Sequence, residues 1–275
     1  MTSEGISSLT YRALVAYEGT RYVGFEVQEN GLSIQEILEA ALLTVTREAV
    51  RVDGSGRTDA GVHAEGQVVS FSLTRPMHPM KVMLALNAIM PPDVAILRIE
   101  RAPSGFHARF SAQSKVYRYT ILNHRARFPH FRSNTFHVPL PLDVAAMREA
   151  AATLVGTHDF TAFAKEADQK KSCVRTIYDL VISVDPPLIF IRVHGNGFLY
   201  NMVRIIAGTL IDVGLGRRSA TSLKDVLQSC VRAEAGSTAP AVGLTLEHVH
   251  YAQPLVFTGD ESEDAPSSSE IRQDV

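Results

Sequence analysis

The sequence predicts a protein of mixed helices and strands, in which β-sheets are covered on one face by α-helices. Segments that alternate apolar and polar residues, typical of strands, take turns along the chain with segments of helical apolar spacing. A content of 45% hydrophobic and 20% charged residues is typical of a soluble globular protein. The 275 residues exceed the usual size of one domain, so we expect one large domain or two fused ones.

The first half of the chain reads as strand, helix, strand, helix and strand. Tyr11 to Tyr17 alternates as a strand does. Ser33 and Glu36 form a capping box, which predicts a helix start, and apolar residues follow at helical spacing. The remaining elements are a strand from Gln67 to Leu73, a helix from Pro79 to Ile89 that Pro91 and Pro92 end, and a strand from Val94 to Glu100.

The second half repeats these element types without a fixed-period sequence repeat. An irregular basic stretch runs from Asn123 to His137. The predicted strands are Lys115 to Leu122, Ile177 to Val184, Leu188 to Val193 and Leu244 to Tyr251, and the predicted helices are Leu142 to Leu154, Leu199 to Val213 and Ser222 to Arg232.

Positive charge gathers in the middle of the chain. From Arg101 to Leu142 there are seven Arg or Lys residues and no Asp or Glu, with Phe128 and Phe131 interleaved. Cations bind phosphates and aromatic rings stack on bases, so the stretch suits RNA, although a solvated basic loop would have the same composition. The net charge of -2 hides this, because the tail from Gly259 to Val275 carries -5 and the rest of the chain +3.

The segment from Asp53 to His63 has the composition of a functional loop. Three glycines in eleven residues allow sharp turns, and Arg57, Asp59 and His63 add ionisable groups. The dinucleotide fingerprint is excluded, because its third glycine is missing and a strand-like segment follows. A plain surface turn in which Arg57 pairs with Asp59 would also fit.

Arg204 lies in a predicted helix that is almost wholly apolar. Burying a guanidinium without a partner is costly, so a carboxylate should lie near it. Helical spacing puts Asn201, Arg204 and Gly208 on one face, which we expect to line a cleft. A structural carboxylate would satisfy Arg204 as well as a catalytic one would.

The main motif of the chain is Gly56-Arg57-Thr58-Asp59-Ala60-Gly61-Val62-His63 with Gly66-Gln67-Val68-Val69. The other motifs, in chain order, are Tyr17 to Gln28, Lys115 to Tyr119, Gly156 to Phe160, Gly197 to Arg204 and Ala239 to Leu244. Together they resemble the tRNA pseudouridine synthase I family (the TruA type) over nearly the whole chain, from about Tyr11 to Tyr251. In the motif from Tyr17 to Gln28, Phe25 and Glu26 stand where the family usually has Trp and Gln.

The resemblance implies an α+β fold of two ferredoxin-like or RRM-like halves, whose antiparallel sheets join across a central catalytic cleft. Residues 1–105 would form the N-terminal half with the catalytic Asp loop. Residues 106–258 would form the C-terminal half with the basic insert and the Arg-bearing helix. Residues 259–275 would form an acidic tail, which its composition predicts to be disordered.

The resemblance also implies a reaction, the isomerisation of uridine to pseudouridine at positions 38, 39 and 40 in the anticodon stem-loop of tRNAs. Asp59 would act in breaking the bond between C1′ and N1, and Arg204 would pair with it, lower its pKa and keep it ionised. Tyr117 would stack on the target uracil, Arg57 would position the flipped-out RNA, and Leu244 would line the pocket. A carboxylate can do this chemistry without a metal or organic cofactor, so none is expected.

Family members act as homodimers on tRNA, which makes tRNA and a second copy of the chain the expected partners. Neither a membrane-length apolar run nor a signal-peptide pattern is found, so a cytoplasmic location is expected. Cys173 and Cys230 lack metal or redox spacing, which suits a reducing compartment.

Two other functional classes remain open at this point. The basic stretch also suits a non-catalytic RNA-binding module that assists tRNA folding. Ten histidines, with His248 and His250 on one side of a predicted strand, suggest a metal-dependent hydrolase, although no third ligand stands at a recognisable spacing.

Overall fold

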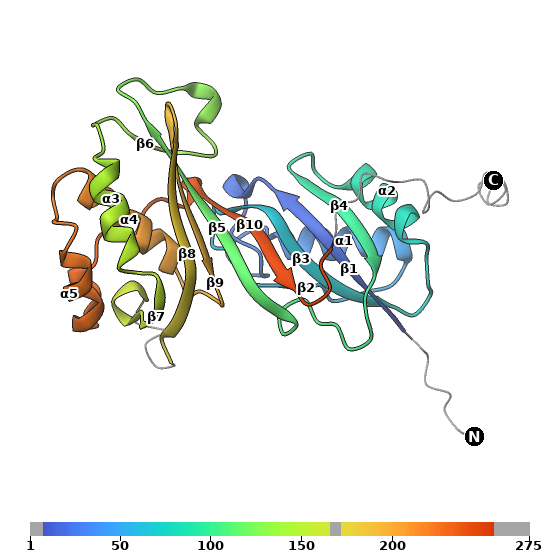
Figure 1. The fold of residues 1–275 in the computed structure, drawn as a ribbon. Coiled ribbons are helices and arrows are strands. Elements are labelled where there is room, and N and C mark those ends of the chain that lie inside the picture. The colour runs from blue at the N-terminus through green and yellow to red at the C-terminus, as the bar shows by residue number, and fades with distance from the viewer. Residues whose placement is uncertain (1–7, 166–171, 256–275) are drawn as a thin grey trace.

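The computed structural model describes residues 8–165 and 172–255, and it confirms the α+β fold class (Figure 1). Within these residues the strands form one ten-stranded sheet in the order β4-β1-β3-β10-β5-β9-β8-β7, with β2 beside β3 and β6 beside β5. The strands are β1 (Leu9–Tyr17), β2 (Asp53–Gly54), β3 (His63–Leu73), β4 (Val94–Arg101), β5 (Ala112–Asn123), β6 (Phe136–Val138), β7 (Gly156–Asp159), β8 (Val174–Asp185), β9 (Leu188–Gly195) and β10 (Leu244–Tyr251). The helices are α1 (Ile34–Thr46), α2 (Pro79–Ile89), α3 (Val144–Ala152), α4 (Met202–Gly214) and α5 (Ser222–Ser229).

β10 joins the two parts of the sheet. It runs parallel to β3, where Thr245 lies opposite His63, and antiparallel to β5, where Leu244 lies opposite Tyr119. A strand from near the end of the chain therefore lies at the centre of the sheet, between strands from both halves. This insertion makes the sheet continuous across the middle of the molecule.

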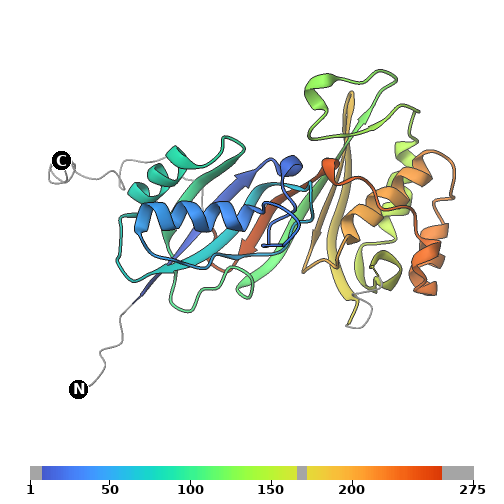
Figure 2. The ribbon, with the colours of Figure 1, turned by 180° about the vertical axis from the view of Figure 1, so that it is seen from behind.

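The helices cover one face of the sheet, as the pattern of the strands requires. Seen from behind, α1 and α4 lie in front of the strands (Figure 2). On β5, Tyr117, Tyr119 and Ile121 are buried on this face, and the Arg118 and Thr120 side chains point to the other one. The buried apolar residues of both halves form one connected core.

Helix boundaries follow local backbone chemistry. The predicted capping box is confirmed, because Ser33 Oγ accepts from the backbone N–H of Glu36 and the Glu36 carboxylate accepts from the N–H of Ser33. The helix predicted from Leu199 begins only at Met202, because Asn201 takes a left-handed backbone with φ of 62°. The helix predicted to run to Arg232 ends at Ser229, because Cys230 takes φ of 55°.

The basic stretch predicted as irregular contains two short elements. A 3-10 turn spans Pro129–Phe131, and β6 runs parallel to β5. The amide Nδ2 of Asn123 donates to the carbonyls of Val138 (2.9 Å) and Leu140 (2.7 Å), which ties the return of the stretch to the sheet. The acidic tail 259–275 lies outside the described residues, and no helix within them is long and apolar enough to cross a membrane.

Candidate active site

The loop that follows β2 is held on the helix-bearing side of β3. Its Ser55 donates from the backbone to Val68 O (2.7 Å) and from Oγ to Gln67 Oε1 (2.5 Å). The Gln67 amide then donates to Gly56 O at 2.9 Å. Gln67 is fully buried, so these bonds are shielded from water and fix the path of the loop.

The next turn of the loop presents Asp59. The backbone N–H of Phe25 donates to Thr58 O (3.1 Å), and Gly24 forms an isolated bridge with Asp59. On the other side, Tyr17 Oη and Thr58 Oγ1 are 2.8 Å apart. Asp59 is thus held by the segment from Gly24 to Phe25 and by β1, and only 16% of its side chain is exposed.

Arg204 reaches Asp59 from α4. Its Nη1 donates to Asp59 Oδ2 at 3.1 Å and to Asn201 Oδ1 at 2.9 Å, and its Nε donates to Ala239 O at 2.8 Å. The Arg204 side chain is 17% exposed, so three fixed acceptors surround a largely desolvated guanidinium. The carboxylate that this cation needs is that of Asp59.

Burial, rather than the ion pair, dominates the pKa of Asp59. Desolvation raises this pKa above its ordinary value, and the hydrogen bond and charge of Arg204, with a smaller effect of Lys165, offset only part of the rise. The expectation that Arg204 sets a lowered pKa for Asp59 is therefore wrong. The physical reason is that the same walls that bring Arg204 close also remove water from the carboxylate.

Tyr117 lies on β5 with its ring buried on the same face of the sheet as Asp59. The ring meets Phe198 edge to face, with centroids 5.3 Å apart. Burial raises the pKa of the Tyr117 phenol, and the charges of Tyr17 and Asp59 raise it further. Leu244 lies opposite Tyr119 on the neighbouring strand, so it shares this face, whereas Leu246 is the residue opposite Tyr117.

Arg57 is separated from this buried group. Its side chain is 70% exposed, and its Nε lies 2.6 Å from Glu26 Oε1. The interpretation of the loop as a surface turn with Arg57 paired to Asp59 is therefore wrong, because Asp59 pairs with Arg204. Glu26 occupies the position where the resembled family usually has Gln, so the ion pair is a consequence of that departure.

Only part of the α4 face that carries Asn201 and Arg204 borders the site. Asn201 and Arg204 lie at the site, as helical spacing predicts. Gly208, about one helical turn beyond Arg204 on the same face, packs against the backbone of Ser237, and a methyl group there would overlap with the Ser237 carbonyl oxygen. The expectation that Gly208 lines the cleft is therefore wrong, since the segment before Ala239 covers it.

Two lysines lie near the site, of which Lys115 was predicted only as part of the basic span and of the motif that carries Tyr117, and Lys165 was not predicted. Lys165 Nζ lies 4.9 Å from the centre of the Tyr200 ring, and its charge acts on Asp59. Lys115 Nζ donates to Ser55 O at 2.7 Å. Lys115 stands in the motif that carries Tyr117, two residues away and on the same side of β5, which is the signal that would have found it.

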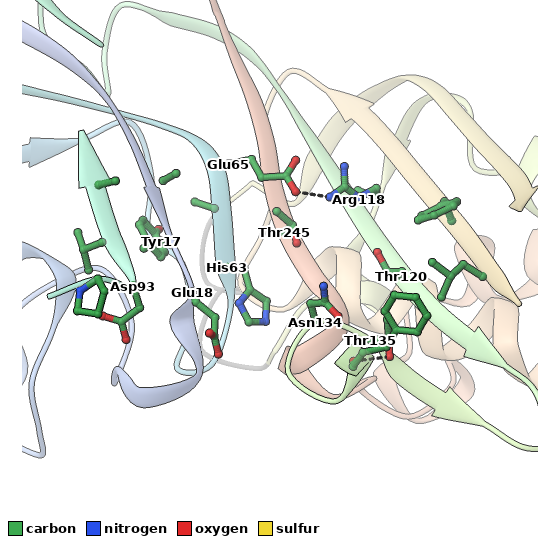
Figure 3. A pocket seen from close by; sticks show the side chains of 18 residues that line it. Tyr17, Glu18, His63, Glu65, Asp93, Arg118, Thr120, Asn134, Thr135 and Thr245 are labelled. Atoms are coloured by element: carbon green, nitrogen blue, oxygen red, sulfur yellow. Dashed lines mark hydrogen bonds and ion pairs between the residues drawn. The ribbon is translucent and has the colours of Figure 1, made fainter. Parts of the chain in front are cut away.

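A groove of about 620 Å³ lies on the other face of the sheet (Figure 3). Arg118 and Thr120 line it, and they point away from Tyr117 by the alternation of β5. Phe131 and Asn134, from the basic stretch, form one of its walls, and the acidic Glu18 and Glu65 are also among its lining residues. The groove is therefore distinct from the Asp59 site.

The histidine pair that suggested a hydrolase does lie together. The rings of His248 and His250 have centroids 4.5 Å apart, and His194 from β9 lies 5.0 Å from His250. Within residues 8–165 and 172–255, no group of three or more His, Cys, Asp or Glu side chains is arranged to hold a metal ion.

Comparison with known proteins gives a consistent match. A family model described as tRNA pseudouridine synthase matches residues 13–111 and 150–252. The tRNA pseudouridine synthase A of Thermoanaerobacter sp. (strain X514) is 43% identical over 86% of this chain and 98% of its own length. The proteins of that name from Brevibacillus brevis and Myxococcus xanthus are 45% and 47% identical, over 87% and 86% of this chain and 98% and 89% of their own lengths.

Proposed function

Since this chain belongs to the tRNA pseudouridine synthase family, we propose that it isomerises uridines 38, 39 and 40 of the tRNA anticodon stem-loop, with Asp59 as its catalytic carboxylate. The observation that carries the proposal is the buried pair of Asp59 and Arg204, which joins two motifs 145 residues apart. A largely desolvated carboxylate held by a fixed cation is typical of a reactive group.

The reaction breaks the bond from C1′ to N1 of uridine, turns the uracil, and joins C5 to C1′. The proton that leaves C5 and the proton that N1 gains balance, so the product is an isomer of the substrate. Asp59 acts in its ionised form, whether it attacks C1′ as a nucleophile or removes a proton from the sugar. Arg204 holds the carboxylate in one orientation through its bonds to Asn201 and Ala239.

The target base has to leave the helical stack to reach Asp59, which costs a few kcal/mol. Tyr117 supplies an aromatic face for the extruded uracil, steadied by the edge of Phe198. Leu244 packs in the same wall and keeps the pocket dry, and Arg57 at the rim contacts the displaced RNA. The roles of Tyr117, Leu244 and Arg57 are those that the resemblance to the family implies.

The wider organisation of the protein follows from the same family membership. We assign residues 1–105 to the half with the catalytic loop, 106–258 to the half with the basic insert and the Arg204 helix, and 259–275 to an acidic tail. A homodimer in the cytoplasm, with tRNA as its partner, completes the proposal.

The test is tritium release from tRNA labelled at uracil C5, because the C5 proton leaves only if isomerisation occurs. We expect release by the wild type and none by Asp59→Asn, with equal tRNA binding by both. Glu29→Gln, which removes an exposed carboxylate from the neighbouring segment, should leave release unchanged and serves as the matched control.

The same assay separates catalysis from simple binding. A wild type that binds this tRNA but releases no tritium would leave a non-catalytic RNA-binding module as the function. Sequencing the product for pseudouridine at each anticodon-arm uridine tests the three positions, and modification elsewhere would overturn that part of the proposal.

A further inference from the structure

Lys115 carries a charge for which the structure provides no counter-ion. The side chain is half-buried, and its single hydrogen bond goes to the neutral carbonyl of Ser55. Among the residues that the structure describes, Lys115 forms no ion pair. Desolvation lowers its pKa to about 8, the change expected of an ammonium that lacks a negative partner.

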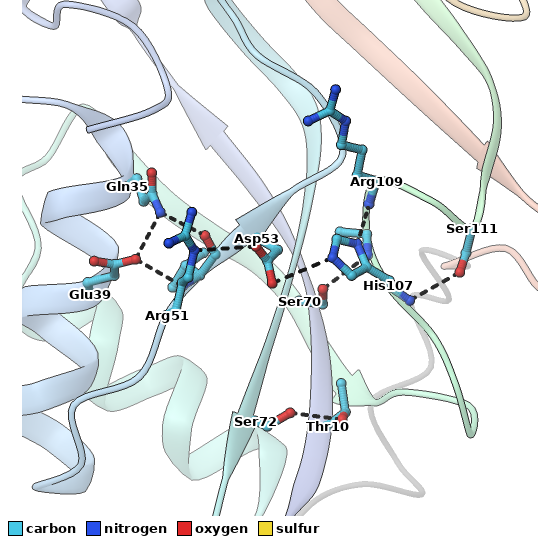
Figure 4. A network of polar contacts seen from close by, with 12 residues as sticks. Thr10, Gln35, Glu39, Arg51, Asp53, Ser70, Ser72, His107, Arg109 and Ser111 are labelled. Carbon is cyan, nitrogen blue, oxygen red and sulfur yellow. Dashed lines mark hydrogen bonds and ion pairs between the residues drawn. The ribbon is translucent and has the colours of Figure 1, made fainter. Parts of the chain in front are cut away.

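The charge of a second cation also destabilises the charged form of Lys115. The charge of Arg109 is the other cause of the lowered pKa of Lys115, and Arg109 likewise forms no ion pair within residues 8–165 and 172–255. Its side chain extends away from the contact of His107 with Asp53 (Figure 4). Two neighbouring cations that repel each other, one of them desolvated, form a site that an anion would stabilise.

Glycine at position 56 leaves room for the Lys115 ammonium group. Gly56 follows Ser55 in the loop, and a Cβ there would overlap with Lys115 Nζ, so the flexible end of Lys115 would have to shift. The loop therefore presents bare backbone at the point where Lys115 approaches. The same loop reaches Arg57 one residue later and Asp59 three residues later.

The surroundings favour an RNA phosphate over another anion. Phe110 is 77% exposed, and its ring lies 5.9 Å from Arg109 Cζ. An exposed aromatic ring beside unpaired cations is the usual composition of a surface that binds single-stranded nucleic acid. Lys115 and Tyr117 are two residues apart on one strand, about 7 Å, so an anion at Lys115 lies close to the proposed uracil pocket.

We propose that Lys115 and Arg109 form a phosphate-binding site beside the catalytic loop, which takes a backbone phosphate of the tRNA next to the nucleotide being isomerised. The inference rests on the proposed function, since it requires tRNA to bind at Asp59. Binding there supplies the missing counter-ion and anchors the RNA close to Tyr117.

The test measures tRNA affinity against KCl concentration in the Asp59→Asn background, so that no turnover occurs. Each lost phosphate contact lowers the slope of log K against log salt by about 0.7 to 0.9. We expect that loss for Lys115→Met and, separately, for Arg109→Met. Lys115→Arg should keep the slope, and Lys81→Met, an exposed lysine on α2 without an ion pair in the described residues, should match the unmodified protein.

The possible outcomes distinguish a failure of the phosphate-site proposal from a failure of the catalytic proposal. If Lys115→Met and Arg109→Met keep the full slope while still folded by circular dichroism, the phosphate site is overturned, and Lys115 only holds the loop. Arg109 is exposed, so Arg109→Met is informative even if Lys115→Met fails to fold. If both slopes fall as expected but wild type releases no tritium, the phosphate site stands and the catalytic proposal falls. A wild type that binds no tRNA would overturn both.

Discussion

Arg204 Nη1 lies 3.1 Å from Asp59 Oδ2, which connects α4 to the loop after β2 through a pair of largely buried charges. Both side chains are less than one fifth exposed, so both charges are largely removed from water. The pair therefore sets the orientation of the Asp59 carboxylate, and its disruption should be felt in the chemical step more than in RNA binding.

Arg204→Met leaves Asp59 desolvated without its cation. The pKa of Asp59 should rise further, because the attraction that offsets burial is lost. We expect kcat/KM for tritium release to fall by about 100-fold or more at neutral pH, since the carboxylate loses its fixed orientation and misplacing a reacting group costs on the order of 100-fold. Arg204→Lys keeps the charge but not the bonds to Asn201 and Ala239, so its kcat/KM should lie between those of the wild type and of Arg204→Met. An unchanged rate for Arg204→Met would show that the pair is dispensable.

The acid side of the wild-type pH profile should report the raised pKa of Asp59. The ionised form is active, and its fraction falls as the pH drops through a pKa that lies above the ordinary value of about 3.9. Activity should therefore decline at a higher pH than an unperturbed carboxylate would give. Single-turnover rates from about pH 4 to 8 measure this limb, and full activity down to about pH 4 would contradict the assignment.

Glu26→Gln should release Arg57 for RNA. The ion pair at 2.6 Å ties Arg57 to a negative charge that also repels phosphates. Exposed pairs contribute under about 1 kcal/mol, so tRNA affinity should rise by about 2- to 5-fold, with little change in the free energy of unfolding. Filter binding at fixed salt measures the change. Glu29→Gln is the control, and equal gains in both variants would point to net charge rather than to Arg57.

Ser33→Ala should lower the free energy of unfolding by about 1 kcal/mol at neutral pH, because the backbone N–H of Glu36 loses its acceptor. The hydrogen bonds from Ser33 lower the pKa of Glu36. A lowered carboxyl pKa contributes stability above the unfolded value, and this contribution is lost as the pH falls through the folded one.

Denaturant unfolding of wild type and Ser33→Ala should therefore give a difference that narrows as the solution is acidified. Thr44→Ala, on the exposed side of α1, removes a hydroxyl that donates to Ala40 O and should have little effect. A difference between wild type and Ser33→Ala that is independent of pH would contradict the role of Glu36 in the cap.

The order and type of the elements could be predicted from the sequence, because they depend on local periodicity and capping. The helix from Pro79 to Ile89 and the strand from Leu244 to Tyr251 have the predicted bounds. The predictions of the ends of α4 and α5 were wrong, since left-handed residues such as Asn201 and Cys230 leave little mark in the apolar pattern.

Single residues of the site could be predicted from the sequence, but not the way in which they are arranged. The apolar surroundings of Arg204 predicted that it needs a carboxylate, and the resemblance supplied Asp59 as the candidate. Only the tertiary structure could decide that burial outweighs this pairing in the pKa of Asp59, that Arg57 turns to Glu26, and that Ser237 covers Gly208. Local sequence determines which residues form helices and strands, whereas desolvation and partner choice depend on segments far apart in the chain that come together only when it folds.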